Sequence, residues 1–109
     1  MRVVLAAEAV LDLKETGDWI AAESPARALT FVRELRALAA SLARHPRRFP
    51  VALRRGDREL RRAVHGNYLV FFELDEAAGT VAVLRIIHGA RDQEALFLAE
   101  DTAGLGGED

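Results

Sequence analysis

The sequence predicts a single α+β domain, in which an N-terminal strand at residues 2–6 and an antiparallel two-helix hairpin precede a three-stranded antiparallel meander in one sheet. Three observations predict this fold. Apolar residues have helical spacing in the first half, β-branched and aromatic runs fill the second half, and proline or glycine marks the junctions. We expect the domain to span residues 1–98 and the acidic tail, residues 99–109, to be disordered.

The first half of the chain supplies the N-terminal strand and the first helix. The strand is the short β-branched run RVVLA. The helix places Val10, Leu13, Gly17 and Ile20 on one apolar stripe, and its acidic residues, Asp12 among them, lie mostly off that stripe. Glycine costs about 1 kcal/mol against alanine inside a helix, so Gly17 indicates either the close approach of another element or a local break.

Punctuating residues mark both ends of the second helix. Ser24 can accept hydrogen bonds from the free amide groups of the first turn, and Pro25 at the first helical position removes no donor that the helix needs. The helix is expected to run to Arg44, because His45 precedes Pro46 and is therefore pushed out of the helical region. The tight turn between the two helices predicts an antiparallel hairpin.

The second half of the chain predicts three strands joined by turns. Residues 45–57 contain two prolines and a glycine and are expected to form a loop. The strands are expected at residues 58–64, 68–74 and 80–87, and the middle one is nearly all apolar and therefore covered. The apolar segment at residues 95–99 is expected to pack as a last turn or as an edge strand.

Composition excludes several classes of protein. The chain has no cysteine, so it can form neither a disulfide framework nor a thiolate metal site. It has no run long enough for a transmembrane helix, and its N-terminus lacks the apolar core of a signal peptide. We therefore expect a soluble cytoplasmic protein that has no membrane partner.

The net charge of −2 conceals two blocks of opposite charge. Residues 44–62 carry eight arginines against two acids, whereas residues 92–109 carry six acids and no base. The two blocks either contact each other or serve different partners. The arginines either form a patch that binds phosphate or an acidic protein, or are simply solvated.

The best-placed polar residues gather at one end of the predicted sheet. Tyr68 opens the second strand of the meander and His88 follows the third, so antiparallel pairing brings them to the same end. We expect Arg61 or Arg62 within one or two residues of that end, and Arg91 follows closely in the sequence. Such a cluster can cleave RNA without a metal, because histidine transfers protons while arginines stabilise transition-state charge. The alternative is a structural corner, in which His88 caps the strand end and Arg91 pairs with a nearby acid.

Three segments together resemble toxins of the ParE/RelE superfamily, also called plasmid stabilization proteins. They are AVLDLKETGDWIAAESPARALTFVRELRALAASLARHPRRFP, ELRRAVHGNYLVFFELD and VAVLRIIHGARD, and they cover most of the chain. The resemblance places Arg61, Tyr68, His88 and Arg91 at motif positions of the family, whereas Phe72 stands where many relatives have a second tyrosine. The long helical hairpin, the GNY step followed by VFFEL, and the ending HGARD lean toward the ParE-like subgroup.

The resemblance implies a toxin that forms a hetero-oligomer with its cognate antitoxin, whose C-terminal segment wraps the helices and the sheet. ParE-like members poison DNA gyrase, which implies action by binding, without catalysis, cofactor or metal. RelE-like members instead cleave messenger RNA on the ribosome, and an inactive relative that only binds antitoxin is a third alternative.

The single lysine and the acidic tail depart from the RelE-like pattern. For a ribonuclease the catalytic candidates are Tyr68, His88, Arg91 and Arg61. For binding to a target, the candidates are Arg61, Arg62, Tyr68, Arg85, His88 and Arg91.

Overall fold

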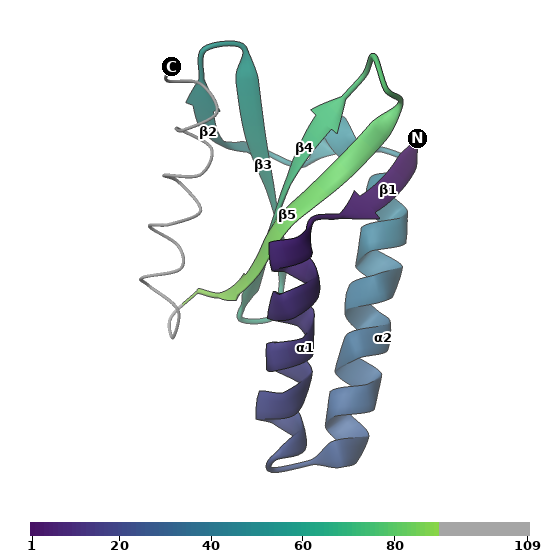
Figure 1. Ribbon diagram of the computed structural model, residues 1–109, viewed down its shortest axis with the longest axis vertical. Coiled ribbons are helices and arrows are strands. Elements are labelled where there is room, and N and C mark those ends of the chain that lie inside the picture. Colours follow the sequence, from purple (N-terminus) through teal and green to yellow (C-terminus); the bar gives the residue numbers. More distant parts are fainter. Residues whose placement is uncertain (90–109) are drawn as a thin grey trace.

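The computed structural model describes residues 1–89, and Figure 1 shows how their helices and strands are arranged. The helical hairpin extends well beyond the end of the sheet (Figure 1). In chain order the elements are β1 (Arg2–Leu5), α1 (Ala7–Ala21), α2 (Pro25–Leu42), the 3₁₀ helix η1 (Pro46–Arg48), β2 (Val51–Arg55), β3 (Arg58–His65), β4 (Tyr68–Asp75) and β5 (Thr80–His88).

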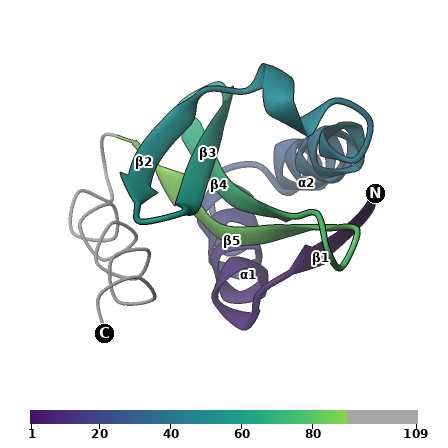
Figure 2. The same cartoon turned by 90° about the horizontal axis from the view of Figure 1, so that it is seen from above.

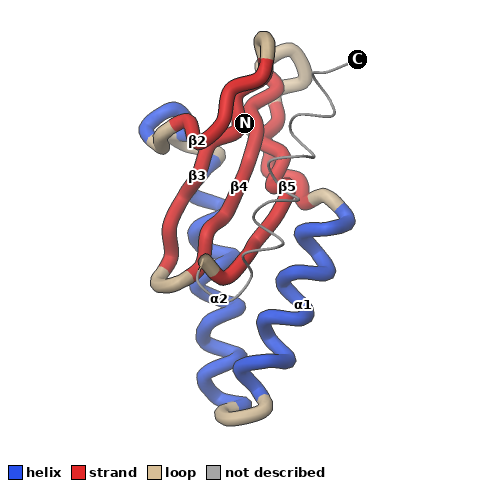
Figure 3. The backbone as a smooth tube through the Cα atoms, turned by 90° about the vertical axis from the view of Figure 1, so that its left-hand side faces the viewer, coloured by secondary structure: helices blue, strands red, loops and turns tan. Residues whose placement is uncertain are grey.

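All five strands form one mixed sheet in the order β1-β5-β4-β3-β2. The strands from β2 to β5 are antiparallel neighbours, whereas β1 lies parallel to β5 at one edge. Residues of both helices pack in one core against the same face of the sheet. Figure 2 looks along the two helices from above, and in Figure 3, where the strands lie side by side, α2 passes behind them. The predicted α+β class, N-terminal strand and helical hairpin are therefore confirmed.

The prediction of a loop at residues 45–57 is wrong, because this segment contains η1 and β2. Gly56 adopts a left-handed φ of 62°, which allows the tight turn from β2 into β3. The carbonyl oxygen of Pro50 accepts a hydrogen bond from the N–H of Arg62 at 3.1 Å and so continues the pairing of the two strands. The meander thus has four strands rather than three. The arginines of β2 hide its strand pattern, although charged side chains are typical of an edge strand.

The ends of α2 follow the predicted chemistry. The hydroxyl of Ser24 accepts a hydrogen bond from the N–H of Arg27 at 3.2 Å, and Pro25 is the first helical residue. The helix ends at Leu42, slightly before the predicted end, and Pro46 then begins η1. Local chemistry therefore fixes the start of α2 more sharply than its end.

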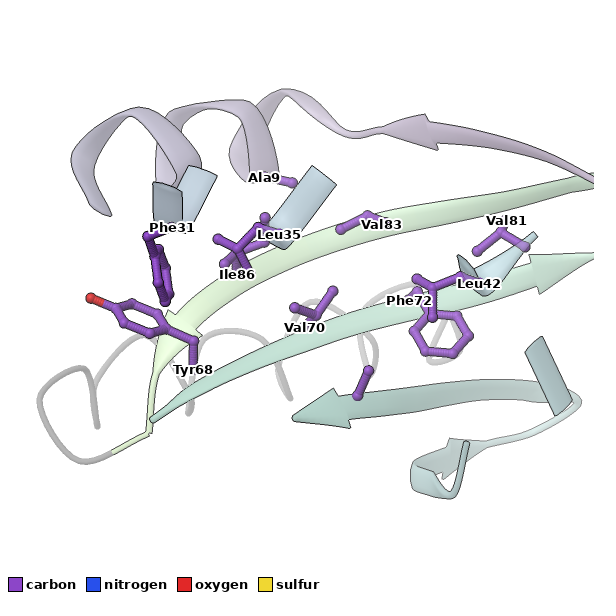
Figure 4. Packing of buried hydrophobic residues seen from close by; sticks show 11 residues of the cluster. Ala9, Phe31, Leu35, Leu42, Tyr68, Val70, Phe72, Val81, Val83 and Ile86 are labelled. Carbon is purple, nitrogen blue, oxygen red and sulfur yellow. The ribbon is translucent and has the colours of Figure 1, made fainter. Parts of the chain in front are cut away.

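The main hydrophobic core fills the space between the helices and the sheet (Figure 4). Phe72 of β4 is fully buried there, and Phe31 of α2 packs over the same face of the sheet. A smaller cluster of Leu60, Phe71 and Ile87 lies on the opposite face, because alternate residues of a strand point to opposite faces. The apolar middle strand predicted from the sequence is thus covered on the helical face by the larger of the two clusters.

The buried face of α1 is rotated from the predicted apolar stripe. Val10 is 53% exposed, whereas Asp12, predicted to lie mostly off the stripe, is 9% exposed. Gly17 causes no break in α1, and a Cβ at this position would lie 3.6 Å from a side-chain atom of Val32 on α2. Gly17 therefore marks the approach of the second helix, which was one of its two interpretations.

Candidate functional site

The end of the sheet beside the β3–β4 turn brings Tyr68 and His88 together. They are register partners in β4 and β5, and their rings meet edge-on with centroids 5.0 Å apart. The ring of Tyr68 also packs against that of Phe31 on α2, at a centroid distance of 4.9 Å (Figure 4). Tyr68 is only 5% exposed as a result, whereas His88 is half-buried. Strand pairing thus creates the contact expected from the sequence, but Tyr68 is mainly a core residue.

A polar cluster extends this aromatic contact along α2. The ring of His65 lies 5.4 Å from the ring of Phe31, and its Nε2 is 2.8 Å from Oε1 of Glu34. Arg27 donates a hydrogen bond to the other carboxylate oxygen of Glu34 at 3.0 Å and lies over the ring of Phe31. The hydrogen bonds from Arg27 and then from His65 hold the pKa of Glu34 below its usual value. The cluster ties the end of β3 to α2.

Arg61 lies away from this end of the sheet. In the β3–β4 ladder Arg61 is four pairs and Arg62 three pairs from the pair of His65 and Tyr68, so the expectation that one of them lies within one or two residues of that end is wrong. The guanidinium of Arg61 donates to the carbonyl oxygens of Phe49 at 2.6 Å and Arg47 at 3.3 Å, and its side chain is 11% exposed. Arg61 therefore supports the segment that leads from η1 into β2.

Arg62 and Arg91 are the next two candidates. Arg62 is exposed and projects from the face of β3 opposite to Arg61, because neighbouring residues of a strand alternate. Its side chain forms no ion pair with any of residues 1–89. Arg91 lies outside the described residues, as do the apolar segment at residues 95–99 and the predicted boundary after residue 98.

Arg85 is engaged with a carboxylate from α1. Its Nε and Nη2 donate to Oδ2 and Oδ1 of Asp12 at 2.7 and 3.0 Å, and the N–H of Ile86 donates to Oδ2 at 2.9 Å. The hydrogen bond to Asp12 raises the pKa of Arg85 above its usual value. The six candidates therefore do not form one site. Tyr68 and His88 contact each other, Arg61 and Arg85 are bound to groups of the protein itself, and Arg62 is exposed.

The arginine-rich block of residues 44–62 is partly neutralised by nearby acids. Four of its eight arginines form ion pairs: Arg47 with Glu76, Arg58 with Glu73, and both Arg54 and Arg61 with Glu59. A groove of about 380 Å³ beside these pairs is lined by both signs of charge. This mixture weakens the case for a nucleic-acid patch, because cations gain affinity for nucleic acid by replacing its counterions.

A second groove, of about 430 Å³, lies between the two helices and the β1 edge of the sheet. Apolar side chains of β1, α1, α2 and the sheet line it, among them Leu5 and Val10, which are 38% and 53% exposed. Arg36 of α2 also lines the groove, and neither it nor the exposed Arg33 forms an ion pair with any of residues 1–89. Exposed apolar side chains beside unpaired arginines suit an amphipathic, acidic partner.

The described part of the chain contains neither a metal-binding cluster nor a membrane-spanning helix. Residues 1–89 contain no group of three or more histidine, cysteine, aspartate or glutamate residues placed to hold a metal ion. No helix within the same residues has both the length and the hydrophobicity needed to cross a membrane.

The sequence model of a protein family, the ParE toxin of type II toxin–antitoxin systems (parDE), matches residues 3–93. The chain belongs to the ParE toxin family. The match confirms the family that the sequence motifs predict and covers both grooves and the Tyr68–His88 contact. No curated protein matches this ParE-family chain significantly.

Solved toxin–antitoxin structures resemble the ParE-family chain along most of its length. The toxin–antitoxin complex RelBE2 from Mycobacterium tuberculosis matches with 26% identity and a TM-score of 0.60, covering 80% of this chain and 88% of the other. The chromosomal ParDE system of P. aeruginosa matches with 16% identity and a TM-score of 0.65, covering 81% and 95%. The RelE–RelB complex of Pyrococcus horikoshii matches with 22% identity and a TM-score of 0.53, covering 83% and 96%.

Sequence reasoning missed the apolar groove and Asp12. The sequence holds no signal for the groove, because Val10 lies on the predicted apolar stripe and only the folded chain shows that it is exposed. The signal for Asp12 was an acid next to the apolar stripe, but its partner Arg85 is 73 residues away in the sequence. Only the packing of α1 against β5 reveals that pair.

Proposed function

We propose that this ParE-family toxin stops growth by binding DNA gyrase, and that its cognate antitoxin neutralises it by occupying the groove between the helices and β1. The observation that carries action by binding is the internal engagement of the residues that a nuclease would use. Arg61 donates to the carbonyl oxygens of Arg47 and Phe49, and Tyr68 is 5% exposed. Catalysis of RNA cleavage requires such groups to be aimed at a substrate.

The antitoxin side of the proposal rests on the chemistry of the apolar groove. Val10 and Leu5 expose apolar surface there, and burying it gains roughly 25 cal/mol per Å². Arg36, which lines the groove on the α2 side, favours a partner with acidic residues beside its apolar ones. An amphipathic helix or strand of an antitoxin has this chemistry. The solved relatives are toxin–antitoxin systems, which supports such a partner.

The gyrase side is tested with purified components. Excess toxin added to DNA gyrase and relaxed plasmid is expected to block supercoiling or to leave cleaved complexes, and antitoxin added first is expected to restore supercoiling. Uninhibited supercoiling at a large excess of toxin would rule out gyrase as the target.

Two arginine variants separate the two surfaces. Arg62→Ala, on the exposed face of β3, is expected to weaken gyrase inhibition and to leave antitoxin affinity unchanged. Arg36→Ala, in the groove, is expected to do the opposite. If both variants lose both interactions, the two surfaces are not distinct and this assignment is wrong.

The alternative is a ribosome-dependent endoribonuclease. The 26% identity to the RelBE2 complex favours it, and so does the contact between Tyr68 and His88, in which the imidazole can transfer protons. Translation extracts would then show messenger RNA cuts at the ribosomal A site that His88→Ala abolishes. Intact messenger RNA in the presence of the wild-type toxin excludes this activity.

Induction of the gene without its antitoxin distinguishes all three candidate activities. Filamentation with a DNA-damage response supports gyrase as the target, whereas immediate arrest of translation supports the ribosome. Continued normal growth, with the protein present and folded, identifies a relative that binds antitoxin without being toxic.

A further inference from the structure

A β-bulge interrupts β5 at Leu84, four residues before its end at His88. Phe72 of β4 pairs with Val83, but the preceding residue Phe71 pairs with Arg85, so Leu84 has no partner in the ladder. The bulge changes which residues face the helices. Before it Val83 lies in the main core, whereas after it the residue in that core is Ile86. A regular strand would place residues of the same parity on one face throughout.

The bulge lies next to the point at which β5 stops pairing with β1. The strand β1 pairs with β5 only as far as Leu5 opposite Val83, after which the chain turns into α1. Beyond that point this edge of β5 faces α1 instead of a strand. A backbone N–H at such an edge needs another acceptor, because burying it unpaired costs about 1–3 kcal/mol.

Asp12 supplies that acceptor. Its carboxylate accepts the N–H of Ile86 at 2.9 Å and two hydrogen bonds from Arg85, the two residues that follow the bulged position. With Asp12 9% exposed, the three bonds are made largely out of water, where charge-assisted hydrogen bonds are strong. One side chain of α1 thus holds both the backbone and a side chain of the bulge.

The bulge decides where His88 lies. His88 is two residues beyond Ile86 and shares its face, which is the face on which Tyr68 packs. Without the extra residue, the alternation of β5 would put His88 on the opposite face. The edge-on contact between Tyr68 and His88 at 5.0 Å therefore depends on the bulge being kept.

We propose that Asp12 is a positioning residue, which fixes the bulge in β5 by binding Ile86 and Arg85 and thereby sets His88 beside Tyr68. The proposal rests on the proposed function only for its effect on toxicity. The effect on the strand is a structural claim that can be measured on any folded sample of the protein.

Nuclear magnetic resonance of the full chain tests the structural claim directly. Tyr68 is the only tyrosine, so its ring signals are unambiguous, and a nuclear Overhauser effect to the ring of His88 reports their contact. In Asp12→Ala this effect should disappear, and the Ile86 amide should exchange at least about tenfold faster. Wild-type values for both in a folded Asp12→Ala would overturn the proposal.

Asp12→Asn keeps the test decisive if Asp12→Ala does not fold. Asparagine retains one acceptor for Ile86 but loses the charge that pairs with Arg85, so we expect faster Ile86 exchange and a weaker Tyr68–His88 effect. If Asp12→Asn leaves both unchanged, the proposal is wrong. Asp18→Asn is the matched control, because Asp18 is an exposed acid of the same helix that pairs with Lys14 on the surface.

Induction of the same variants tests the consequence for toxicity. Asp12→Asn is expected to arrest growth less than the wild type at equal soluble level, whereas Asp18→Asn is expected to match the wild type. A shifted β5 with undiminished toxicity would support the positioning role and leave the proposed function standing, but it would overturn the expected link between the Tyr68–His88 contact and toxicity. A wild-type protein that is not toxic would refute the proposed function, and the resonance experiment would still decide the role of Asp12.

Discussion

Nε2 of His65 on β3 lies 2.8 Å from Oε1 of Glu34 on α2, and this contact joins the end of the sheet to the second helix. Arg27 holds the other oxygen of the same carboxylate. These two neighbours favour the ionised form, so the pKa of Glu34 is lower in the folded protein than its usual value. A lowered folded pKa stabilises the protein above the pKa of the unfolded chain, and this stability is lost as the pH falls through the folded value.

Glu34→Gln should therefore destabilise the protein in a pH-dependent way. The loss is expected at neutral pH and should shrink as the pH falls below about 4, where the wild-type carboxyl is also becoming neutral. Urea unfolding at several pH values measures the difference between the two proteins. Glu23→Gln, at the exposed end of the hairpin, serves as the control. A difference that stays constant from neutral to acid pH would contradict the assigned role of Glu34.

Gly17→Ala is expected to stabilise the protein by about 1 kcal/mol, because glycine inside a helix is unfavourable by that amount relative to alanine. The added Cβ would meet the side chain of Val32 at 3.6 Å, which is an ordinary van der Waals contact. Thermal or urea unfolding measures the change. A lower stability of the variant would show that the two helices need a closer approach than this contact indicates.

Phe72→Ala is expected to destabilise the protein by about 3–5 kcal/mol, since it removes a fully buried aromatic ring and leaves a cavity. The ring of Phe49 meets that of Phe72 edge-on at 5.7 Å, so the segment before β2 should loosen as well. Val64→Ala, at a position that is 61% exposed, is the control and should change stability by less than about 0.5 kcal/mol. Equal losses in both variants would contradict the core assignment.

Local signals explain why some elements were predictable. The start of α2 depends on Ser24 and Pro25, which act on the adjacent turn, and the hairpins depend on neighbouring residues. Strand β2 was missed because its register comes from pairing with β3, and its own residues Arg54 and Arg55 resemble those of a solvated loop. Pairing with a neighbour decided that strand, and a single sequence does not display it.

In the candidate site, too, the contacts that depend on nearby turns were predictable and those made with distant residues were not. Hairpin pairing placed Tyr68 beside His88, and this contact was predictable from turn positions alone. Arg61 and Arg85 were named as candidates for binding a target, and the sequence did not reveal their acceptors, which come from elsewhere in the chain: carbonyl groups before β2 for Arg61, and Asp12 on α1 for Arg85. An arginine is available to a partner only where the fold leaves it unpaired, and the sequence does not show its acceptors.

The groove between the helices and β1 gives the most direct test of antitoxin binding, because two neighbouring residues of α1 differ in their relation to it. Val10 lines the groove and is 53% exposed, whereas Leu11 is 58% exposed but does not line it. Aspartate at either position exposes a similar polar group to water in the free toxin, so both variants should remain folded.

Val10→Asp is expected to weaken antitoxin binding by at least about tenfold, or ~1.4 kcal/mol, because the complex would bury a carboxylate in an apolar groove. The new charge would also repel acidic residues of the partner, although Arg36 can offset part of that repulsion. Leu11→Asp should bind within about twofold of the wild type, a difference of roughly 0.4 kcal/mol. Titration calorimetry with the purified antitoxin measures both. If Leu11→Asp loses as much affinity as Val10→Asp, the antitoxin binds a wider surface of α1 than the groove, and the proposed interface must be redrawn.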